Sequence, residues 1–419
     1  MDDAEAFRRA ATARPEDDLL RLVLADWYED HEQVGYAEFI RAQVDLAPRK
    51  AWEPEFVRAK WFAPSHFSGS PFRSLLPEFH PRVAEWPAVG PFERGLPAKL
   101  IVRDLHSFLN IADEFCERYP LTSLFLPTAS LPEWQRFAAA PWLPNIRRIG
   151  FYGLTTPIEA LRTLTERGTA IGLRELTLER AGGPAVAEML RELFRSPLGK
   201  QLESLDLRAG HDHDGEWIDA IEAANGEQKL TSLSVTTIDL SEAAGERLAA
   251  AGFVSKLQSL RYSLARIAPE TFEGLNAAGK LSQVRELGFR GTQSELMMLE
   301  GMFNFGNLQS LRLLDFSENP LNGWPSLDRA VFWATRLTSL MLSQTQLTDF
   351  TFDRLGAMPF WPDLVELDLR ENELNGTYHR LSFETPPTGL VALVLPARLE
   401  NTRIRNRLRD HYGDAVLFR

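Results

Sequence analysis

A ladder of regularly spaced apolar residues runs through the last three quarters of the chain. The pattern L-x-x-L-x-L, with isoleucine, valine, phenylalanine or tyrosine sometimes replacing leucine, recurs at intervals of 25 to 29 residues. Its first positions are Leu121, Ile146, Leu173, Leu202, Leu230, Leu257, Val284, Leu311, Leu337, Leu364 and Leu390. A nearly fixed period over so many units predicts a solenoid, in which each unit packs only against its neighbours.

Each unit of the ladder is long enough for one strand and one helix. The three apolar anchors suit a short strand, and apolar residues at helical spacing follow them. These helical segments are 188–194, 217–223, 243–250, 295–303 and 329–333. We therefore expect an α/β solenoid whose parallel strands line one face, with helices on the opposite face.

The longer pattern L-x-x-L-x-L-x-x-N-x-L is complete only in the units that contain Asn319 and Asn372, and Thr345 takes the place of asparagine between them. The amide at this position normally satisfies backbone groups at a turn, so less regular turns are expected in the N-terminal repeats. The chain resembles the helix-backed, ribonuclease-inhibitor-like class of leucine-rich repeat proteins. This resemblance implies a horseshoe with strands on its concave face and helices on its convex face.

Residues 1–47 have a helical pattern of their own. Residues 2–13 suit a short amphipathic helix, and apolar positions between Leu19 and Val44 predict two further helices joined around residues 31–35. The segments P-E-D-D-L-L-R-L-V-L-A-D-W-Y-E-D and G-Y-A-E-F-I-R-A-Q resemble the repeat-companion domain that precedes leucine-rich repeats in some bacteria. This resemblance implies a bacterial, architectural module with no established catalytic activity.

Four acidic residues of this helical module, Asp26, Glu29, Asp30 and Glu38, leave two interpretations open. They could hold a metal ion or take part in acid-base chemistry. They could instead form a solvated helical face, on which Asp26 caps a helix or pairs with Arg21 or Arg41.

The other domain boundaries follow from composition. Residues 48–95 lose the periodicity and gather aromatic residues and prolines, which predicts a connector that covers the N-terminal end of the solenoid. An aromatic ligand groove is the alternative. The solenoid is expected over residues 96–400, with about eleven repeats and a first cap strand. Residues 401–419 have the pattern of a C-terminal cap: a polar helix, a glycine and a short strand.

Composition narrows the choice of partners. The chain has 46 basic and 58 acidic residues and a formal charge of -12, so as a whole it repels phosphate backbones and anionic lipids. The single cysteine, Cys116, can form no internal disulfide and has the apolar neighbours of a buried side chain. Neither a secretory signal nor an apolar run of about 18 residues occurs in the sequence. We expect a cytoplasmic protein that binds neither nucleic acid nor membrane.

The sequence contains no intact catalytic motif. The segment G-L-N-A-A-G-K, from Gly274 to Lys280, matches the start of a phosphate-binding loop, but Leu281 stands where magnesium requires a hydroxyl. A glycine helix stop is the simpler interpretation. A serine nucleophile elbow, an H-E-x-x-H segment and a C-x-x-C pair are missing from the sequence. Bacterial ubiquitin ligases with leucine-rich repeats use a catalytic cysteine in a separate domain, which this sequence lacks. We expect no enzyme and no cofactor.

One segment keeps a metal site open as an alternative. His211, Asp212, His213 and Asp214 follow the Leu202 strand, and imidazoles beside carboxylates can hold zinc or another divalent ion. Adjacent residues rarely converge on one ion, so His211 and His213 are the candidate ligands. On this interpretation the chain would be a metal-dependent hydrolase; otherwise the segment is a polar loop.

The residues between the strand anchors supply the candidate partner contacts. They mix hydroxyls with charges of both signs, which suits a hydrated protein partner better than nucleic acid or lipid. The candidates are Arg148, Tyr152, Glu179, Asp206, Arg208, Arg261, Arg290, Asp315, Met341, Asp368 and Arg370. In the Leu364 repeat, Glu366, Asp368 and Arg370 are expected to face outward. We therefore predict a non-enzymatic protein-interaction scaffold that uses its concave strand face. The alternative is a regulatory or sensor subunit of a protease or defence effector encoded nearby.

Overall fold

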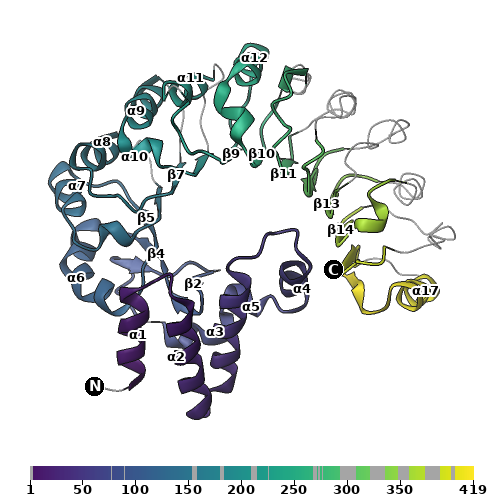
Figure 1. Cartoon of the computed structure of the whole chain (residues 1–419), viewed down its shortest axis with the longest axis horizontal. Helices are drawn as coiled ribbons and strands as arrows, with labels where there is room; N and C mark the ends of the chain where they lie inside the picture. The colour runs from purple at the N-terminus through teal and green to yellow at the C-terminus, as the bar shows by residue number, and fades with distance from the viewer. Residues whose placement is uncertain are drawn as a thin grey trace. The chain divides into compact units, whose positions relative to one another are not determined.

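The computed structural model describes residues 3–76, 78–88, 90–152, 158–179, 184–208, 215–224, 226–267, 271, 274–275, 277–292, 308–320, 336–347, 358–372, 387–397 and 402–419. Contacts divide the chain into two compact units, whose elements are labelled in Figure 1. Unit 1 comprises residues 1–50, 59–180 and 192–204, and unit 2 comprises residues 51–58, 181–191 and 205–419. The domain boundaries drawn from composition stay a prediction.

Unit 1 contains the first part of the ladder as a run of parallel strands. These strands are β4 (Lys99–Val102), β5 (Ser123–Leu126), β6 (Arg148–Phe151) and β7 (Glu175–Glu179). They pair in sequence order, and the short antiparallel strand β1 (Ala84–Glu85) covers the edge of β4. Leu124 and Leu126 of β5, like Ile149 and Phe151 of β6, are buried because alternate side chains point into the core.

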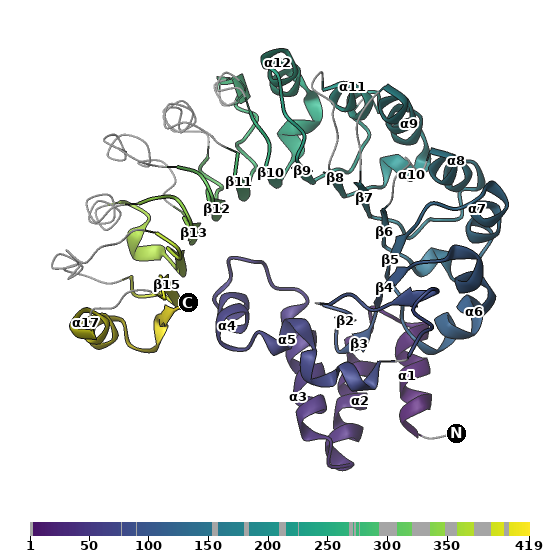
Figure 2. The same cartoon turned by 180° about the vertical axis from the view of Figure 1, so that it is seen from behind.

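The helices of the unit 1 repeats all lie on the same side of the sheet that these strands form (Figure 2). They are α6 (Leu105–Arg118), α7 (Leu131–Ala138), α8 (Ile158–Arg167) and α10 (Pro197–Lys200), with the short helix η2 (Leu143–Asn145) before β6. α9 (Pro184–Arg195) has residues in both units. α6 begins at Asp104, whose carboxylate accepts a hydrogen bond from the backbone nitrogen of Ser107 at 3.1 Å. This cap fixes where the chain turns from strand to helix.

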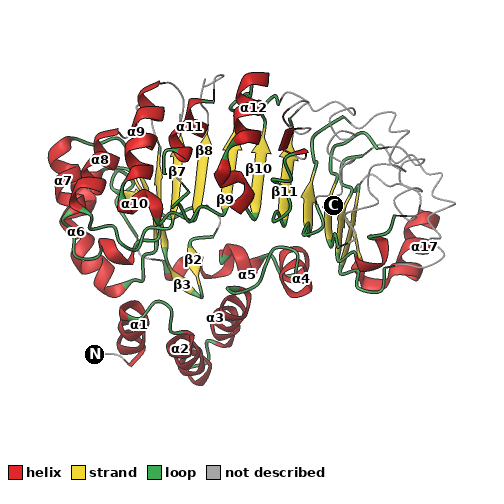
Figure 3. Ribbon diagram, turned by 45° about the horizontal axis from the view of Figure 1, so that its top comes forward, coloured by secondary structure: helices red, strands yellow, loops and turns green. Residues whose placement is uncertain are grey.

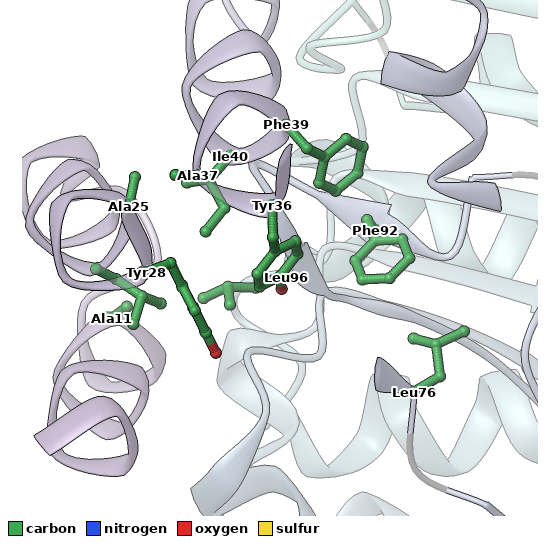
Figure 4. Close-up of a cluster of buried hydrophobic side chains, with 11 residues drawn as sticks. Ala11, Ala25, Tyr28, Tyr36, Ala37, Phe39, Ile40, Leu76, Phe92 and Leu96 are labelled. Carbon is green, nitrogen blue, oxygen red and sulfur yellow. The ribbon is translucent and has the colours of Figure 1, made fainter. Parts of the chain in front are cut away.

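Three helices form the helical module at the start of unit 1 (Figure 3). They are α1 (Asp3–Ala13), α2 (Asp18–Asp30) and α3 (Val34–Leu46). Their inner faces contribute Ala25, Tyr28, Tyr36 and Phe39 to one apolar cluster (Figure 4), to which Leu24 also belongs. The Tyr36 hydroxyl donates to the Gly95 carbonyl at 2.9 Å, so the buried ring keeps a polar partner. The small helical module expected before the repeats is confirmed.

Aromatic rings of the connector that belong to unit 1 pack within that unit. The elements of the connector include α4 (Pro54–Phe62), which has residues in both units, α5 (Ser65–Ser68), η1 (Ser70–Leu75), β2 (Phe92–Glu93) and β3 (Leu96–Pro97). Phe72 and Phe92 lie against Phe39 of α3, with ring centroids 4.9 and 5.3 Å apart. Phe79 lies against Phe115 of α6 at 5.0 Å. These rings therefore serve as packing between the helical module and the first repeats.

Unit 2 continues the ladder with one strand in each repeat. Its strands are β8 (Ser204–Arg208, of which 205–208 belong to this unit), β9 (Ser232–Thr236), β10 (Ser259–Ser263), β11 (Glu286–Arg290), β12 (Leu313–Asp315), β13 (Ser339–Met341), β14 (Glu366–Asp368), β15 (Ala392–Leu395) and β16 (Val416–Phe418). From β9 to β16 they pair in parallel and in sequence order. The expected C-terminal helix, glycine turn and strand are present at the end of this run.

Helical segments of unit 2 follow its strands. Those described are α11 (Glu216–Glu222), α12 (Glu242–Ala250), η3 (Gly252–Lys256), η4 (Trp361–Asp363), α17 (Thr402–Tyr412) and η6 (Gly413–Ala415). The helices predicted at 295–303 and 329–333 lie outside the described residues. Ten of the eleven first-position anchors are buried and Leu390 is half-buried. The α/β leucine-rich repeat fold, with strands and helices on opposite faces, is thus confirmed in both units.

Asparagines of the long pattern join neighbouring repeats at their turns. The Asn372 Oδ1 accepts hydrogen bonds from the backbone nitrogens of Thr345 and Leu347 at 2.9 and 3.1 Å. Asn319 binds the backbone nitrogen of Thr292 in the same way at 2.9 Å. The threonine hydroxyls also donate to these amide oxygens, at 3.0 Å for Thr345 and 3.1 Å for Thr292. An alternation of threonine and asparagine therefore satisfies buried polar groups over four repeats.

Removing one of these amides should destabilise the fold. We expect Asn372→Ala to lower the free energy of unfolding by about 2–4 kcal/mol, because several buried backbone groups lose a partner. Denaturant unfolding followed by circular dichroism measures the change. Asn406→Ala, on the exposed side of α17, is the matched control and should stay within about 0.5 kcal/mol of the native chain. Equal stability of the two variants would contradict the role of Asn372.

Aromatic rings stack at the third anchor of three successive repeats in unit 2. Tyr262 lies parallel to Phe289 with ring centroids 6.2 Å apart, and Phe289 lies 5.9 Å from Phe316. The buried Tyr262 hydroxyl has no hydrogen-bond partner among the described residues. Burial raises the pKa of Tyr262, so the phenol stays neutral. The Tyr262 oxygen is therefore a polar atom within an otherwise apolar stack of rings.

Loss of the hydroxyl should change the free energy of unfolding in opposite directions at two buried tyrosines. Tyr262→Phe is expected to raise the free energy of unfolding by about 1 kcal/mol, because it removes an unsatisfied polar atom. Tyr36→Phe should lower the free energy of unfolding by about 1 kcal/mol, because it leaves the Gly95 carbonyl without that donor. Both variants are compared by denaturant unfolding. A loss of stability in Tyr262→Phe equal to that in Tyr36→Phe would show that the Tyr262 hydroxyl has a partner.

Candidate protein-interaction surface

The strand face consists of the outward side chains that alternate with the buried anchors on each strand. In unit 1 its candidate residues are held by internal contacts. Arg148 of β6 binds Glu175 of β7, with a distance of 2.6 Å between Nε and Oε2. The Tyr152 hydroxyl donates to the Val102 carbonyl of β4, and Glu179 is half-buried at the end of β7. Contacts between strands therefore fix the orientation of Arg148 and Tyr152.

In unit 2 the most exposed candidates are arginines paired across strands. Arg261 of β10 binds Glu286 of β11, and Arg290 binds Glu318 with Nε and Oε1 2.9 Å apart. The side chains of Arg261 and Arg290 nevertheless remain 49% and 55% exposed. The hydrogen bond to Glu318 raises the pKa of Arg290, so its guanidinium is charged at any physiological pH. These groups are preoriented and still accessible.

The aspartates beside these arginines have local roles. Asp206 binds Arg208 of the same strand, with Nε and Oδ2 2.8 Å apart. The Asp315 Oδ1 accepts a hydrogen bond from the backbone nitrogen of Ser317 at 2.9 Å. Met341 at the end of β13 is half-buried. Part of the acidic charge expected to contact a partner is therefore used in turns and in ion pairs within the chain.

The Leu364 repeat corrects one expectation. Glu366 and Asp368 were expected to face outward, but they are only 0% and 2% exposed. The Ser339 hydroxyl of β13 donates to Glu366 at 2.5 Å. Asp368 accepts bonds from the backbone nitrogen of Arg370 at 3.1 Å and from its guanidinium at 2.8 Å. Because Arg370 lies over this carboxylate, the prediction that Asp368 is an accessible partner contact is wrong.

Sequence reasoning missed the glutamates that pair with the exposed arginines. Glu286 and Glu318 lie 25 and 28 residues after Arg261 and Arg290, which is close to one repeat. Opposite charges one repeat apart in outward columns are the signal that identifies such pairs. Leu264 was missed as well: it follows β10 with a φ of 54° and is 55% exposed. It places an apolar side chain beside the charged pairs.

Two glycines in the same outward column have different surroundings. A Cβ at Gly150 would lie 2.5 Å from ring carbons of Phe125 on the neighbouring strand. A Cβ at Gly288 would lie 3.4 Å from the side chain of Arg261, which is an ordinary contact. Gly150 is therefore needed for the Phe125 ring to lie across β6, whereas Gly288 tolerates a methyl group.

Metal and nucleotide sites receive no support from the described part of the chain. The candidate ligands His211 and His213, with Asp212 and Asp214, lie outside the described residues. Within the described ranges no group of three or more histidine, cysteine or acidic side chains is placed to hold a metal ion. In the segment that matches a phosphate-binding loop, Gly279 has a φ of 65° and the Lys280 amine donates to the Ala251 carbonyl at 3.0 Å. That geometry fits the glycine helix stop.

The single cysteine lies beside a small hollow in unit 1. Cys116 of α6 is half-buried, not buried as its neighbours in the sequence suggest. The hollow is also lined by Thr12, Tyr119 and Trp142, and it has room for about one water molecule. Burial raises the pKa of the Cys116 thiol, mainly by desolvation, so the thiolate needed for nucleophilic chemistry is disfavoured.

Comparisons with known proteins give only distant likenesses. No protein-family model matches the chain, and no curated protein matches it. Solved structures that resemble it include the complex of Rad7 and Elc1 in yeast, at 14% identity and a TM-score of 0.34, covering 68% of this chain and 85% of the other. An internalin from Listeria monocytogenes has 14% identity and a TM-score of 0.36, covering 65% and 73%.

A third similar structure is the leucine-rich repeat ectodomain of the receptor kinase GASSHO1/SCHENGEN3 from Arabidopsis thaliana in complex with CASPARIAN STRIP INTEGRITY FACTOR 2. It has 18% identity and a TM-score of 0.31, covers 63% of this chain, and is matched over 34% of its own length. At such TM-scores these likenesses do not bear on function, and the fold assignment rests on the strand ladder itself. Among the described residues, no helix is both long and apolar enough to span a bilayer.

The close approach at Gly150 can be tested. Gly150→Ala should lower the free energy of unfolding by about 1–3 kcal/mol, because the Phe125 ring has to move. Gly288→Ala is the matched control, with an expected change within about 0.5 kcal/mol. Denaturant unfolding of Gly150→Ala in the native chain and in a Phe125→Ala background isolates the contact. An equal cost in both backgrounds would show that the ring is not responsible.

Proposed function

We propose that the chain is a non-enzymatic scaffold that binds another protein through its strand face in unit 2. The contact surface, here named the β9–β11 face, consists of Ser232, Ser234, Thr236, Ser259, Arg261, Ser263, Glu286 and Arg290. All eight are at least partly exposed, and they lie on three strands that pair in register. This accessibility, set against the burial of Glu366 and Asp368, is the observation that supports the proposal.

The chemistry of the β9–β11 face suits a hydrated protein interface. Its hydroxyls both donate and accept hydrogen bonds, and it presents charges of both signs: Arg261 pairs with Glu286 within the face, and Arg290 pairs with Glu318 just beyond it. The side chains project from a hydrogen-bonded sheet, so little backbone ordering has to accompany binding. The exposed Leu264 at one end of the face offers an apolar anchor. The mixed charge favours a protein over nucleic acid.

The identity of the partner stays a prediction from the sequence. The interpretation as a regulatory or sensor subunit of a protease or defence effector concerns that identity, as does the cytoplasmic location. The metal-dependent hydrolase depends on His211 and His213, which lie outside the described residues. No contact among the described residues favours either alternative over the scaffold.

Exchanging the charges of Arg290 and Glu318 distinguishes a role of Arg290 in partner binding from a role in local structure. A partner captured by the full chain is purified, and its affinity is measured by isothermal calorimetry. Arg290→Glu should weaken binding by about tenfold or more, because a charge-assisted contact is replaced by repulsion. The double variant Arg290→Glu with Glu318→Arg restores the internal ion pair but keeps the surface charge reversed. We expect it to stay weak.

The matched control is Arg162→Glu on α8, whose arginine also forms an exposed ion pair, with Glu192 at 3.3 Å. This variant loses the same kind of pair away from the strand face and should bind as the native chain does. Recovery of binding in the exchanged variant would assign Arg290 a purely structural role. Unchanged binding by Arg290→Glu would place the contact elsewhere.

A further inference from the structure

The inner and outer faces of α2 differ in what covers them. Leu24 and Tyr28 on the inner face are buried in the core of the helical module. On the outer face Leu19 is 67% exposed, and Val23, one turn later, is 36% exposed. Asp26 and Asp30 continue this outer face at helical spacing and are both exposed. The face therefore has an apolar first half and an acidic second half.

The surrounding charge is strongly negative. Residues 1–47 contain twelve acidic and five basic side chains, a formal charge of -7 in a module that makes up about a ninth of the chain. Arg41 of α3 binds Asp26 at 2.6 Å and Glu29 at 2.5 Å. Its positive charge therefore compensates part of the acidic charge between α2 and α3. The hydrogen bonds to Asp26 and Glu29 raise the pKa of Arg41, so this guanidinium stays charged.

Other carboxylates of the module are left without compensation. Asp30, Glu32 and Glu38 are exposed, and the structure records no ion pair for them within the described residues. A single exposed leucine is ordinary on a protein surface. An exposed leucine and valine one turn apart, on the same helical face as Asp30, which is exposed and unpaired among the described residues, are a more specific feature. These residues are complementary to a partner that is apolar at one end and basic at the other.

Spacing defines the shape of this partner. Leu19 and Asp30 are eleven residues apart on one helix, so the face extends about 16 Å. A helix of three turns placed along α2 matches this length and can present two apolar side chains one turn apart. Lysine or arginine two turns further along then reaches Asp30 and its acidic neighbours. The negative charge disfavours an anionic membrane as the occupant.

We propose that the outer face of α2 is a docking site for a basic amphipathic helix of another protein. Leu19 and Val23 contact the apolar residues of that helix, and Asp30 with Glu32 and Glu38 contacts its basic residues. This site is chemically different from the β9–β11 face, because it combines apolar contacts with charge of a single sign. The two surfaces therefore select different partners or different segments of one partner.

A designed peptide provides the test. The probe is a capped alanine-rich helix with two leucines one turn apart and lysines two turns further along, labelled for fluorescence anisotropy. The full chain should bind it saturably, and raising salt from about 0.05 to about 0.5 M should weaken binding several-fold. The double variant Leu19→Ser and Val23→Ser should weaken binding at least about tenfold. Ile171→Ser, which removes another exposed apolar side chain of unit 1, should leave the affinity unchanged.

Three outcomes would overturn the proposal. The first is no saturable binding by the native chain, and the second is equal binding of a peptide with the same composition in scrambled order. The third is sedimentation showing self-association that the Leu19→Ser and Val23→Ser variant abolishes, which would place a second copy of the chain on this face. Thermal unfolding of each variant confirms that the helical module is folded, since Leu19 and Val23 lie outside its buried core.

Discussion

A single repeat cannot bury its own leucines, and the rest of the structure depends on this constraint. Each strand and helix encloses an apolar layer whose open sides are covered only by the neighbouring repeats. The cost of a misplaced layer is large, because all the anchors except the half-buried Leu390 are nearly fully buried side chains. Parallel pairing in register follows, with Leu233, Leu260 and Leu287 opposite one another on β9, β10 and β11. A nearly constant repeat length keeps the strands in that register.

The same constraint determines the polar contacts between repeats. Turns stacked one repeat apart bury their backbone groups close together, so one amide can satisfy groups in two repeats. The Asn372 side chain accepts from the backbone nitrogen of Thr345 in the preceding repeat and donates to the Leu369 carbonyl of its own repeat. On the strand face, register brings Arg261 beside Glu286. An exposed pair of this kind contributes only about 0–1 kcal/mol to stability. A protein partner can therefore share or replace such a pair at little cost to the fold.

The ladder, the strands and the helical module could be predicted because they follow from periodicity within the chain. Leu364 and Asn372 were placed correctly for that reason, since their roles are the same in every complete repeat. The exposure of outward residues could not be predicted in this way. Asp368 alternates as an exposed residue should, yet Arg370 lies over it, and Glu366 is met by Ser339 from the preceding repeat. Their burial depends on side chains that meet only after the repeats have stacked. Thr292 was missed because its hydroxyl acquires its role from Asn319, one repeat later.

Stacking also explains why the outward residues that differ between repeats are more informative about function than the residues that every repeat shares. The anchors and turn amides are required by packing, so their presence says nothing about a partner. Outward positions are freer, because a hydroxyl, a charge or a glycine there leaves the apolar layer intact. Gly150 is an exception, since the Phe125 ring lies across it. Where outward residues are accessible and have no such packing role, as with Leu264 beside Arg261 or Leu19 beside the acidic turns of α2, their chemistry is available for recognition. The β9–β11 face and the outer face of α2 are two described surfaces on which exposed apolar and charged groups meet that condition together.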